Sequence, residues 1–294
     1  MPELPEVESQ ARDLRRSISD RRILDVWVGW KKSIATPSAQ AFKEKLKGQR
    51  FGDIKRRGKF IIINLGKFAL VSHFRMTGHF RLVPLRDSKS AREWYLYPKD
   101  RFTRVAFKLD RQQVLHFSDI RKFGRLWLVD AKKVDQLPEL HALGPEPLAP
   151  SFTAREFIKC LRRHSGMIKP VLLKQDCVAG IGNIYADESL FDAQIHPKTR
   201  VKKLSDQQLT ILFQMVRSNL ADGVGHHGAS VGDYINLKGD KGRQGFYLRV
   251  YGQAGQACGQ RRGEKRKTCR GRVKRIVVAQ RGTHICPACQ KVQK

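Results

Sequence analysis

The chain has 294 residues, of which 40% are hydrophobic, and this length predicts about two domains with a sizeable core. No run approaches the ~18 consecutive apolar residues of a transmembrane helix. The N-terminal MPELPEVESQ also lacks the basic and apolar regions of a secretory signal. We therefore expect a soluble, intracellular protein that has no membrane partner.

The charge of the chain is strongly positive. Lysine and arginine number 58 against 27 acidic residues, which gives a net charge of +31. A field of this size calls for a polyanionic partner, because a merely solubilising surface needs far less excess charge. No basic amphipathic helix faced with Trp and Phe is visible, so a membrane surface is the weaker alternative. Nucleic acid is the expected partner.

In chain order, the first expected element is a helix over 5–18. Pro5 suits a first helical position, and Val7, Ala11 and Leu14 follow with helical spacing. Short apolar or alternating runs then predict an antiparallel β-sandwich or barrel. These runs cover residues 23–28, 60–65, 68–74, 80–83, 104–109, 114–117 and 125–129. We expect this N-terminal domain over 1–142, followed by a proline-rich hinge over 143–150.

The pattern becomes helical after the hinge. Thr153 to Glu156 and Ser205 to Gln208 both have the form of a capping box. Asn183 is expected to cap a helix over 184–193, and the glycine-rich turn before it offers backbone N–H groups to a phosphate, unless it is an ordinary helix turn. We expect a helical domain over 151–248, with a glycine-rich loop at about 223–245, and a terminal module over 249–294. The fold class is α+β multidomain.

The Met-Pro start has a chemical interpretation. Removal of Met1 would expose a secondary amine on Pro2, and α-amino groups titrate near ~8, so a useful fraction is neutral at cellular pH. Such an amine can attack an electrophilic carbon and form an iminium with an opened sugar. Glu3 and Glu6 are candidate acid and base groups beside it. Most Met-Pro starts have no such role, which is the alternative.

Two segments place a large apolar residue among polar neighbours. They are HFRMT at 73–77, with Met76, and SDIRKFG at 118–124, with Phe123. Exposed apolar side chains between basic residues suit insertion into a base stack, although core packing is the usual role of Met and Phe in strands.

Four of the six cysteines fall at or after residue 258. Because an intracellular chain keeps its thiols reduced, Cys258, Cys269, Cys286 and Cys289 are interpreted as ligands of one structural Zn²⁺ per chain. The ten residues between Cys258 and Cys269 exceed the usual spacing, so the assignment of Cys258 has the least support of the four. Another donor or a water in its place, or two free thiols, remain the alternatives. We expect 261–267 to form a basic loop. Cys160 and Cys177 are expected to be ordinary buried side chains.

Taken together, the motifs resemble the formamidopyrimidine-DNA glycosylase family over essentially the whole chain. The matching segments are PELPEVE at 2–8, GKF at 58–60, HFRMTG at 73–78, DIRKFG at 119–124, LGPEPL at 143–148, IKPVLLKQDCVAGIGNIYADESLF at 168–191, RVYGQAG at 249–255 and AQRGTHICPACQK at 279–291. The resemblance implies an N-terminal β-sandwich flanked by a helix, a helix–two-turn–helix domain and a zinc-finger hairpin. It also implies a bifunctional glycosylase and abasic-site lyase of base excision repair. The lesions would be 8-oxoguanine and formamidopyrimidines in duplex DNA, and the enzyme would be a monomer near the nucleoid.

The resemblance implies roles by position. Pro2 matches the nucleophile that attacks C1′, Glu3 the proton donor in ring opening, and Lys59 the proton donor in β-elimination. Arg281 matches a phosphate-binding arginine that assists δ-elimination. The DNA-binding positions divide into residues that fill the gap left by the everted nucleotide, Met76, Arg121 and Phe123, and further DNA contacts, His73, Lys169 and Asn183.

Departures from the family pattern leave alternatives open. Arg75 stands where glycine is frequent, Ile120 replaces a frequent proline, and Phe102 falls where a DNA-contacting histidine is often found. Two alternatives remain. One is an enzyme acting on oxidised pyrimidines, as in the endonuclease VIII-like branch, and the other is a non-catalytic zinc protein that binds nucleic acid.

Overall fold

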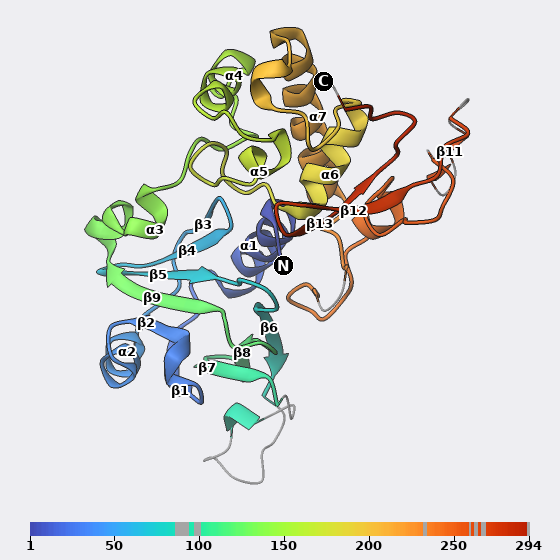
Figure 1. Cartoon of the computed structure of the whole chain (residues 1–294). Helices are drawn as coiled ribbons and strands as arrows, with labels where there is room; N and C mark the ends of the chain where they lie inside the picture. The colour runs from blue at the N-terminus through green and yellow to red at the C-terminus, as the bar shows by residue number, and fades with distance from the viewer. Residues whose placement is uncertain are drawn as a thin grey trace. The chain divides into compact units, whose positions relative to one another are not determined.

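The computed structural model describes residues 1–85, 94–96, 101–231, 234–258, 260–261, 264–265 and 269–292 (Figure 1). The chain forms two compact units. The first comprises Met1–His141 together with Ala229–Gly242, and the second comprises Ala142–Gly228 together with Arg243–Lys294. Among the described residues, no helix has the length and apolar character needed to span a membrane.

The first unit is a β-sandwich with a helix at its N-terminal end, α1 (Leu4–Ile18). One sheet has the order β1 (Ile23–Val28), β7 (Thr103–Leu109), β8 (Gln113–Ser118), β6 (His79–Pro84), and the other has the order β2 (Ile34–Thr36), β9 (Arg125–Asp130), β5 (Phe68–His73), β4 (Phe60–Leu65), β3 (Ile54–Arg57). All pairings are antiparallel except that of β2 with β9. The connecting elements are α2 (Ala39–Leu46), α3 (Pro138–His141) and the 3-10 turns η1 (Lys31–Ser33), η2 (Trp94–Leu96) and η3 (Ala131–Gln136).

The sandwich core confirms the strands expected from hydrophobic patterning. The buried cluster joins one face of α1, through residues such as Val7 and Leu14, to both sheets, through residues such as Ile61 and Phe107. Strands β2 and β3 were not expected. β3 reads Ile-Lys-Arg-Arg and has a single apolar residue, so its place depends on pairing with β4, where Arg57 faces Phe60.

The segment Ala229–Gly242 belongs to the first unit, which the sequence did not suggest. Its Leu237 is buried in the sandwich core, and the backbone N–H of Leu82 in β6 donates to the Leu237 carbonyl at 3.0 Å. Gln10 on α1 donates from Nε2 to the Ile235 carbonyl at 2.9 Å. These contacts attach the segment to β6 and α1, the helix whose N-terminus carries the candidate nucleophile.

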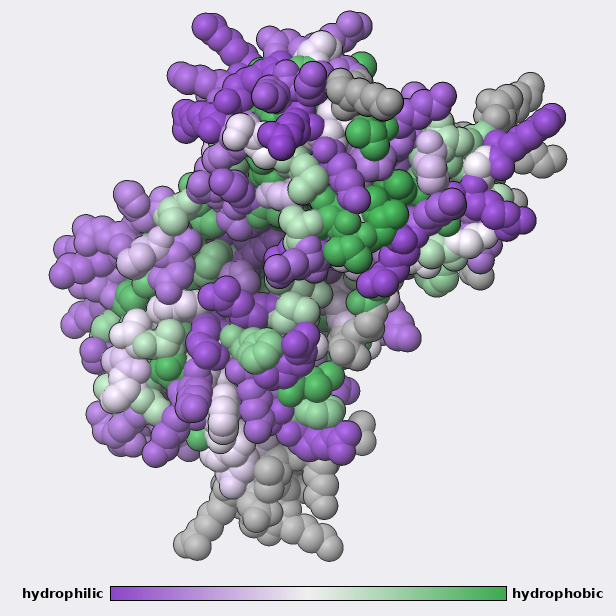
Figure 2. Space-filling view, in the orientation of Figure 1, coloured by the Kyte–Doolittle hydropathy of each residue, from purple (hydrophilic) through white to green (hydrophobic). Residues whose placement is uncertain are grey.

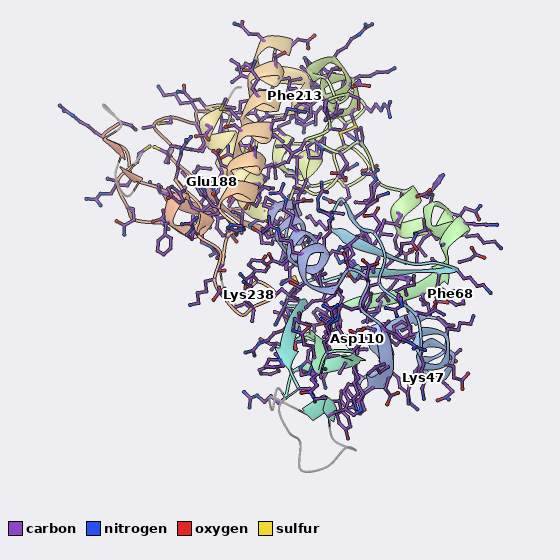
Figure 3. All side chains as sticks on the ribbon, turned by 180° about the vertical axis from the view of Figure 1, so that it is seen from behind. Lys47, Phe68, Asp110, Glu188, Phe213 and Lys238 are labelled. Carbon is purple, nitrogen blue, oxygen red and sulfur yellow. A yellow bond between two sulfur atoms is a disulfide. The ribbon has the colours of Figure 1, made fainter. Side chains whose placement is uncertain are left out.

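The second unit contains the helices and the C-terminal hairpins. Its elements are α4 (Ala154–Arg162), α5 (Ile168–Leu172), α6 (Asn183–Asp192), η4 (Val201–Lys203), α7 (Asp206–Gly225), η5 (Gln244–Tyr247), β10 (Gln260–Arg261), β11 (Glu264–Lys265), β12 (Lys274–Val278) and β13 (Arg281–Ile285). Both expected capping boxes are present. On α7, Phe213 (labelled in Figure 3) packs against Phe157 of α4, with 5.5 Å between ring centroids.

Two local expectations need correction in this unit. The N-cap of α6 is Gly182, so Asn183 is the first helical residue and does not cap the helix. Cys160 and Cys177 are not independent buried side chains, because they form a disulfide that links α4 to the segment after α5. The described backbone at 260–261 and 264–265 forms a short hairpin, and the rest of the basic loop expected over 261–267 lies outside the described residues.

Candidate active site and nucleic-acid interface

The N-terminus of α1 is buried and tightly organised. Pro2 is buried, and Glu3 and Glu6 are only 2% and 1% exposed. The two glutamates form a reciprocal capping box, in which the Glu3 backbone N–H donates to Glu6 Oε2 at 2.7 Å. Carboxylates are favoured here because the first turn of a helix has unpaired N–H groups and positive potential. The helix therefore holds a carboxylate directly beside Pro2.

Glu6 is fully engaged in backbone contacts. Besides the Glu3 N–H, its Oε1 accepts the N–H of Ala229 at 2.7 Å. The hydroxyl of Tyr234 donates to the Glu6 carbonyl at 2.9 Å. Burial, with the Glu6 charge nearby, raises the pKa of Tyr234 well above its usual range, so this phenol stays a donor. These contacts argue against the proton-transfer role expected for Glu6.

Lys59 directly precedes β4, and His73 ends β5, the neighbouring strand of the same sheet. Lys59 follows Gly58 in the two-residue turn between β3 and β4, and it is 6% exposed. His73 ends β5, and its Nδ1 accepts the backbone N–H of Arg75 at 2.9 Å. Burial and the positive charges of Arg75 and Lys59 lower the pKa of His73 to about 3. His73 is thus a neutral imidazole whose Nε2 carries the proton, as a hydrogen-bond donor to an anion requires.

Met76 and Phe123 are exposed, although both lie in strand-rich sequence. Met76 is 38% exposed and Phe123 48% exposed, on the turns after β5 and β8. The Arg121 guanidinium lies over the Phe123 ring, 4.9 Å from its centroid. Neither apolar side chain is therefore part of the core, and both are available to a partner.

Asp119 holds these two turns together, a role the sequence did not indicate. Its side chain is fully buried and accepts the Thr77 hydroxyl, the Arg121 N–H at 3.2 Å and the Gly124 N–H at 2.7 Å. One carboxylate thereby joins the turn that carries Met76 to the turn that carries Phe123. The one signal in the sequence is that Asp119 is the acidic residue of the basic motif DIRKFG at 119–124.

One residue in each of these two turns has a positive φ: Arg75 in the turn after β5 and Lys122 in the turn after β8. Arg75 has φ +54°, in the left-handed region that favours glycine, so the glycine frequent at this position has a conformational reason. Lys122 has φ +60°, and its ammonium lies 4.4 Å from the ring centroid of Trp30. The backbone at Trp30 is held in turn, because the main-chain N–H of Trp30 donates to the Arg104 carbonyl at 3.2 Å. No motif in the sequence pointed to Trp30.

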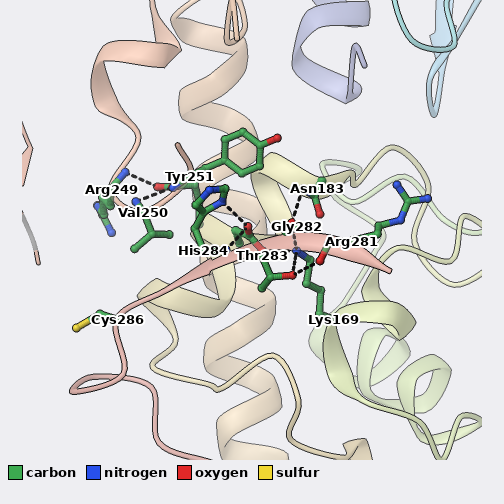
Figure 4. A network of polar contacts seen from close by, with 12 residues as sticks. Lys169, Asn183, Arg249, Val250, Tyr251, Arg281, Gly282, Thr283, His284 and Cys286 are labelled. Carbon is green, nitrogen blue, oxygen red and sulfur yellow. Dashed lines mark hydrogen bonds and ion pairs between the residues drawn. The ribbon is translucent and has the colours of Figure 1, made fainter. Parts of the chain in front are cut away.

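In the second unit, Lys169 is completely buried. Its Nζ forms an ion pair with Asp187 at 2.6 Å and contacts the Thr283 hydroxyl at 2.7 Å and the Gly282 carbonyl at 3.3 Å (Figure 4). Asp187 also accepts the His284 N–H at 2.9 Å. These contacts join α5, α6 and β13. The direct phosphate contact expected for Lys169 does not fit this burial, because the ammonium is engaged by Asp187 and Thr283.

Asn183 and Arg281 lie near this network. Asn183 donates from Nδ2 to the Gly282 carbonyl at 2.9 Å, while its buried Oδ1 has no hydrogen-bond partner among the described residues. Arg281 is exposed at the start of β13, just after the left-handed turn residues Ala279 and Gln280 (Figure 4). It borders a pocket with Lys169, Pro170, Leu173, Lys174, Val278 and Ala279. An exposed guanidinium beside a pocket that Lys174 also borders is suited to bind an oxyanion.

Glu188 anchors the segment that leads to the cysteine module. It is 1% exposed and accepts the backbone N–H groups of Arg249, Val250 and Tyr251 at 2.8, 3.0 and 2.8 Å (Figure 4). One carboxylate thereby provides hydrogen-bond acceptors for three successive backbone N–H groups at 249–251, which lie outside the described strands. No feature of the sequence distinguishes Glu188 from its neighbours.

The four C-terminal cysteines form one cluster. The Sγ atoms of Cys258, Cys269, Cys286 and Cys289 all lie within 4.8 Å of one another. The Cys258–Cys289 and Cys269–Cys286 sulfur distances are 3.6 and 3.7 Å. A tetrahedral Zn²⁺ with bonds of about 2.3 Å places its sulfurs about 3.8 Å apart, so these residues fit the ion. The cluster can hold a structural zinc, and the long Cys258–Cys269 spacing does not separate the sulfurs.

The surroundings of the sulfurs support the same conclusion. A Cβ at Gly271 would lie 2.7 Å from Cys286 Sγ, so only glycine leaves room there. The Gly271 N–H donates to Cys269 Sγ at 3.3 Å, the kind of contact that orients a thiolate ligand. Few other groups are buried nearby, chiefly Phe191, Val250 and Val273.

Family models match three successive parts of the chain. They are the formamidopyrimidine-DNA glycosylase N-terminal domain over 1–126, the H2TH domain of the same enzyme over 143–234, and a zinc finger found in FPG and IleRS over 263–292. Among curated proteins, the formamidopyrimidine-DNA glycosylase of Brevibacillus brevis is 39% identical over 100% of both chains. That of Herpetosiphon aurantiacus is 38% identical over 99% of this chain and 100% of its own.

The chain belongs to the formamidopyrimidine-DNA glycosylase family. It is a DNA glycosylase and abasic-site lyase of base excision repair. The solved structures agree. A Lactococcus lactis Fpg in complex with an abasic site containing DNA superposes with a TM-score of 0.87, at 33% identity over 98% of this chain and 99% of that chain. A mutant of the L. lactis protein with THF containing DNA gives the same TM-score at 34% identity, over 99% and 100%.

Proposed function

We propose that this glycosylase excises oxidised purines, 8-oxoguanine and formamidopyrimidines, from damaged duplex DNA and then cleaves the strand by β,δ-elimination. The observation that carries the proposal is the buried N-terminus of α1, where Pro2 adjoins the capped carboxylates of Glu3 and Glu6. Support comes from the structures of L. lactis Fpg in complex with DNA that contains Fapy-dG or an abasic site.

The first chemical step belongs to Pro2. Once Met1 is removed, the secondary amine of Pro2 attacks C1′ of the damaged nucleotide, and the C1′–N bond to the base breaks. Glu3 donates a proton as the sugar ring opens, which leaves an iminium between Pro2 and C1′. A buried carboxylate next to the amine suits this role, because proton transfer is fastest between groups held within hydrogen-bond reach.

Strand cleavage uses cationic groups on both units. Lys59, in the β3–β4 turn, serves the β-elimination, and Arg281 binds phosphate and assists the δ-elimination. His73 and Asn183 contact the DNA backbone. His73 is suited to this contact because it is neutral, so its Nε2–H donates without the cost of desolvating a charge.

Removal of a base from a duplex requires the nucleotide to leave the stack, at a cost of a few kcal/mol. The exposed side chains of Met76 and Phe123 fill the gap, and Arg121 faces the base left without a partner. Their exposure supports this role, because a core residue has no surface to offer. Glu6 and Lys169 act as positioning residues, since their polar atoms are engaged inside their own units.

The role of the four-cysteine zinc cluster is structural. A zinc ion held by its four thiolates supplies folding energy to a module with few buried apolar groups and takes no part in the chemistry. The β12–β13 hairpin between Cys269 and Cys286 then presents Arg281. We propose that the protein acts as a monomer within the cell, because one chain supplies every group named here.

Borohydride trapping tests the proposal. Wild-type protein and a duplex with one 8-oxoguanine should give a covalent adduct, and peptide mapping should locate the DNA on Pro2. A variant with one extra residue between Met1 and Pro2 should give none, because the amine becomes an amide. A Lys59→Met variant, which keeps the amine, is the matched control and should still be trapped.

The outcomes separate the alternatives. Trapping that is undiminished with a blocked N-terminus would remove Pro2 as nucleophile. Trapping only with oxidised-pyrimidine duplexes would favour the endonuclease VIII-like activity. Tight duplex binding without trapping on any lesion would make the chain a non-catalytic binding protein.

A further inference from the structure

The disulfide between Cys160 and Cys177 takes no part in the proposed repair chemistry. The two cysteines are 17 residues apart in the sequence, one on α4 and the other in the turn that precedes α6. His164 places a ring nitrogen within 4.8 Å of both sulfurs. Lys174 Nζ lies 3.2 Å from His164 Nδ1. A bonded cysteine pair with a histidine and a lysine beside it is an arrangement that favours thiol chemistry.

We propose that Cys160 and Cys177 are a reversible redox pair, oxidised by peroxides and reduced by dithiols, which staples the turn before α6 to α4. The proposal is independent of the glycosylase chemistry and of the zinc cluster. It rests on three observations: the sulfurs are bonded, one of them reaches the surface, and the turn they fix is the one that leads into Asn183.

Accessibility distinguishes the two sulfurs. Cys160 is 9% exposed, near the end of α4, whereas Cys177 is 1% exposed. Cys160 is therefore the thiol that a small oxidant can reach. The His164 ring, which Lys174 contacts at Nδ1, has a nitrogen within 4.8 Å of this sulfur, and an imidazole at this position can stabilise a thiolate by hydrogen bonding.

The oxidation step balances with a hydroperoxide as oxidant. The Cys160 thiolate attacks one peroxide oxygen, the O–O bond breaks, and the leaving hydroxide takes a proton to become water. The resulting sulfenic acid on Cys160 is attacked by the Cys177 sulfur, which forms the S–S bond and releases a second water. Two thiols and one hydrogen peroxide thus give one disulfide and two waters. A dithiol reverses the change through a mixed disulfide and becomes oxidised itself.

The turn around Cys177 is held by other contacts as well. Gln175 donates from Nε2 to the carbonyls of Leu173 and Ile181, both at 2.9 Å, and its Oε1 accepts the Gly180 N–H at 2.9 Å. The Ala179 N–H donates to the Pro145 carbonyl at 3.0 Å. The reduced protein should therefore keep its fold, and the disulfide adds stability by closing a loop of 17 residues.

Thiol counting on the zinc-loaded protein tests the pair. After treatment with dithiothreitol, alkylation under denaturing conditions with a chelator should label six thiols per chain. After mild hydrogen peroxide that leaves the zinc bound, it should label four, and peptide mapping should show Cys160 joined to Cys177. The Cys160→Ser/Cys177→Ser double variant should show four labels in both states, with one zinc per chain throughout.

A thermal melt of the wild-type protein tests the staple without any substitution. The peroxide-treated form should unfold roughly 5–10 °C above the reduced form. The double variant should melt at one temperature under both conditions. His164→Gln should slow the loss of thiols at least about threefold without changing the final count, because it removes the group that favours the thiolate.

Three results would overturn the proposal. The first is six labelled thiols after peroxide while the zinc stays bound. The second is equal melting temperatures for the two wild-type forms. The third is a second zinc in the reduced wild type that the double variant lacks, which would make Cys160, His164 and Cys177 a metal site.

Discussion

The two units of this glycosylase position their functional groups in different ways. The first has a large apolar core, from α1 across both sheets, and its functional residues lie at a helix end and on strand turns. The cysteine module of the second has a small buried cluster in which Phe191, Val250 and Val273 accompany the cysteines. Where the core is large, polar contacts only aim the side chains. Where it is small, the module needs a metal ion to hold its backbone in place.

Most of the visible surface is hydrophilic. Figure 2 shows hydrophilic side chains over most of the visible face, as expected for a chain with 58 basic residues. Exposed apolar residues are therefore informative. Met76 and Phe123 stand out in the first unit because both lie on turns held by a buried carboxylate, that of Asp119.

The largest effect should come from removal of a zinc ligand. Cys286→Ser removes a fully buried sulfur, and structural zinc sites contribute on the order of 10 kcal/mol to folding. We expect zinc content to fall from one per chain to near zero and duplex binding to weaken at least about tenfold, since Arg281 loses its support. Metal analysis and binding isotherms measure both changes.

Cys258→Ser sharpens this test, because Cys258 is the ligand beyond the long insertion. It should also lose zinc, whereas the Cys160→Ser/Cys177→Ser variant should keep it. Full zinc retention in Cys258→Ser would show that another donor or water occupies the fourth position. A zinc-free wild type that is folded and active would refute the site as a whole.

The next effect concerns the turns of the first unit. Asp119→Ala leaves the Thr77 hydroxyl and the Gly124 N–H without this acceptor and leaves the Arg121 N–H with Thr77 Oγ1 alone, which should cost about 2–4 kcal/mol of unfolding free energy. Phe123→Ala removes an exposed ring, so it should change stability by less than about 0.5 kcal/mol.

Excision separates the two variants. Phe123→Ala should slow base removal from duplex DNA but affect cleavage of a pre-formed abasic site less, because less stacking must be broken there. Denaturant unfolding and single-turnover assays measure both quantities. A loss of about 3 kcal/mol or more in Phe123→Ala would indicate a core residue and contradict the wedge role.

A pH-dependent effect is expected from His73. Its folded pKa of about 3 lies below the unfolded value of about 6.5, so the unfolded chain binds the additional proton at intermediate pH. Stability from this residue is present above about pH 6.5 and is lost as the pH falls toward 3, at about 1.4 kcal/mol per pH unit. Between pH 6.5 and 5 the loss should approach 2 kcal/mol. Urea unfolding of wild type and His73→Gln at both pH values should show a shallower dependence in the variant, and parallel slopes would contradict a neutral buried imidazole.

The smallest effect should come from the Trp30–Lys122 contact. Cation–π pairs at exposed sites contribute about 0.5–1 kcal/mol, which corresponds to a two- to five-fold change. We expect Trp30→Leu and Lys122→Met each to slow excision by about this factor, with no further loss in the double variant, and Trp30→Phe to restore most of the rate. Additive losses in the double-mutant cycle would show that the two residues act separately.

The sequence by itself determined the local helices and strands and identified the candidate functional residues. The strands at 23–28 and 60–65, both capping boxes and the cysteine motif follow from patterns that act over a few residues. The candidate nucleophile, the basic surface and the partner class also follow from residue type and charge. These inferences need no long-range contact.

Tertiary structure decided what depends on residues far apart in the chain. Both carboxylate oxygens of Glu6 accept backbone N–H groups, one of them from Ala229. Lys169 is buried in contact with Asp187 and Thr283. Tertiary structure also brought Cys258 to the other sulfurs across the insertion and joined Cys160 to Cys177. The physical reason is that the sequence shows which side chains carry a charge or a thiol, but it does not show which residue each of them contacts in the folded chain. The partner that satisfies such a group once it is buried is set by packing between distant segments, where an unpaired polar group is too costly to keep.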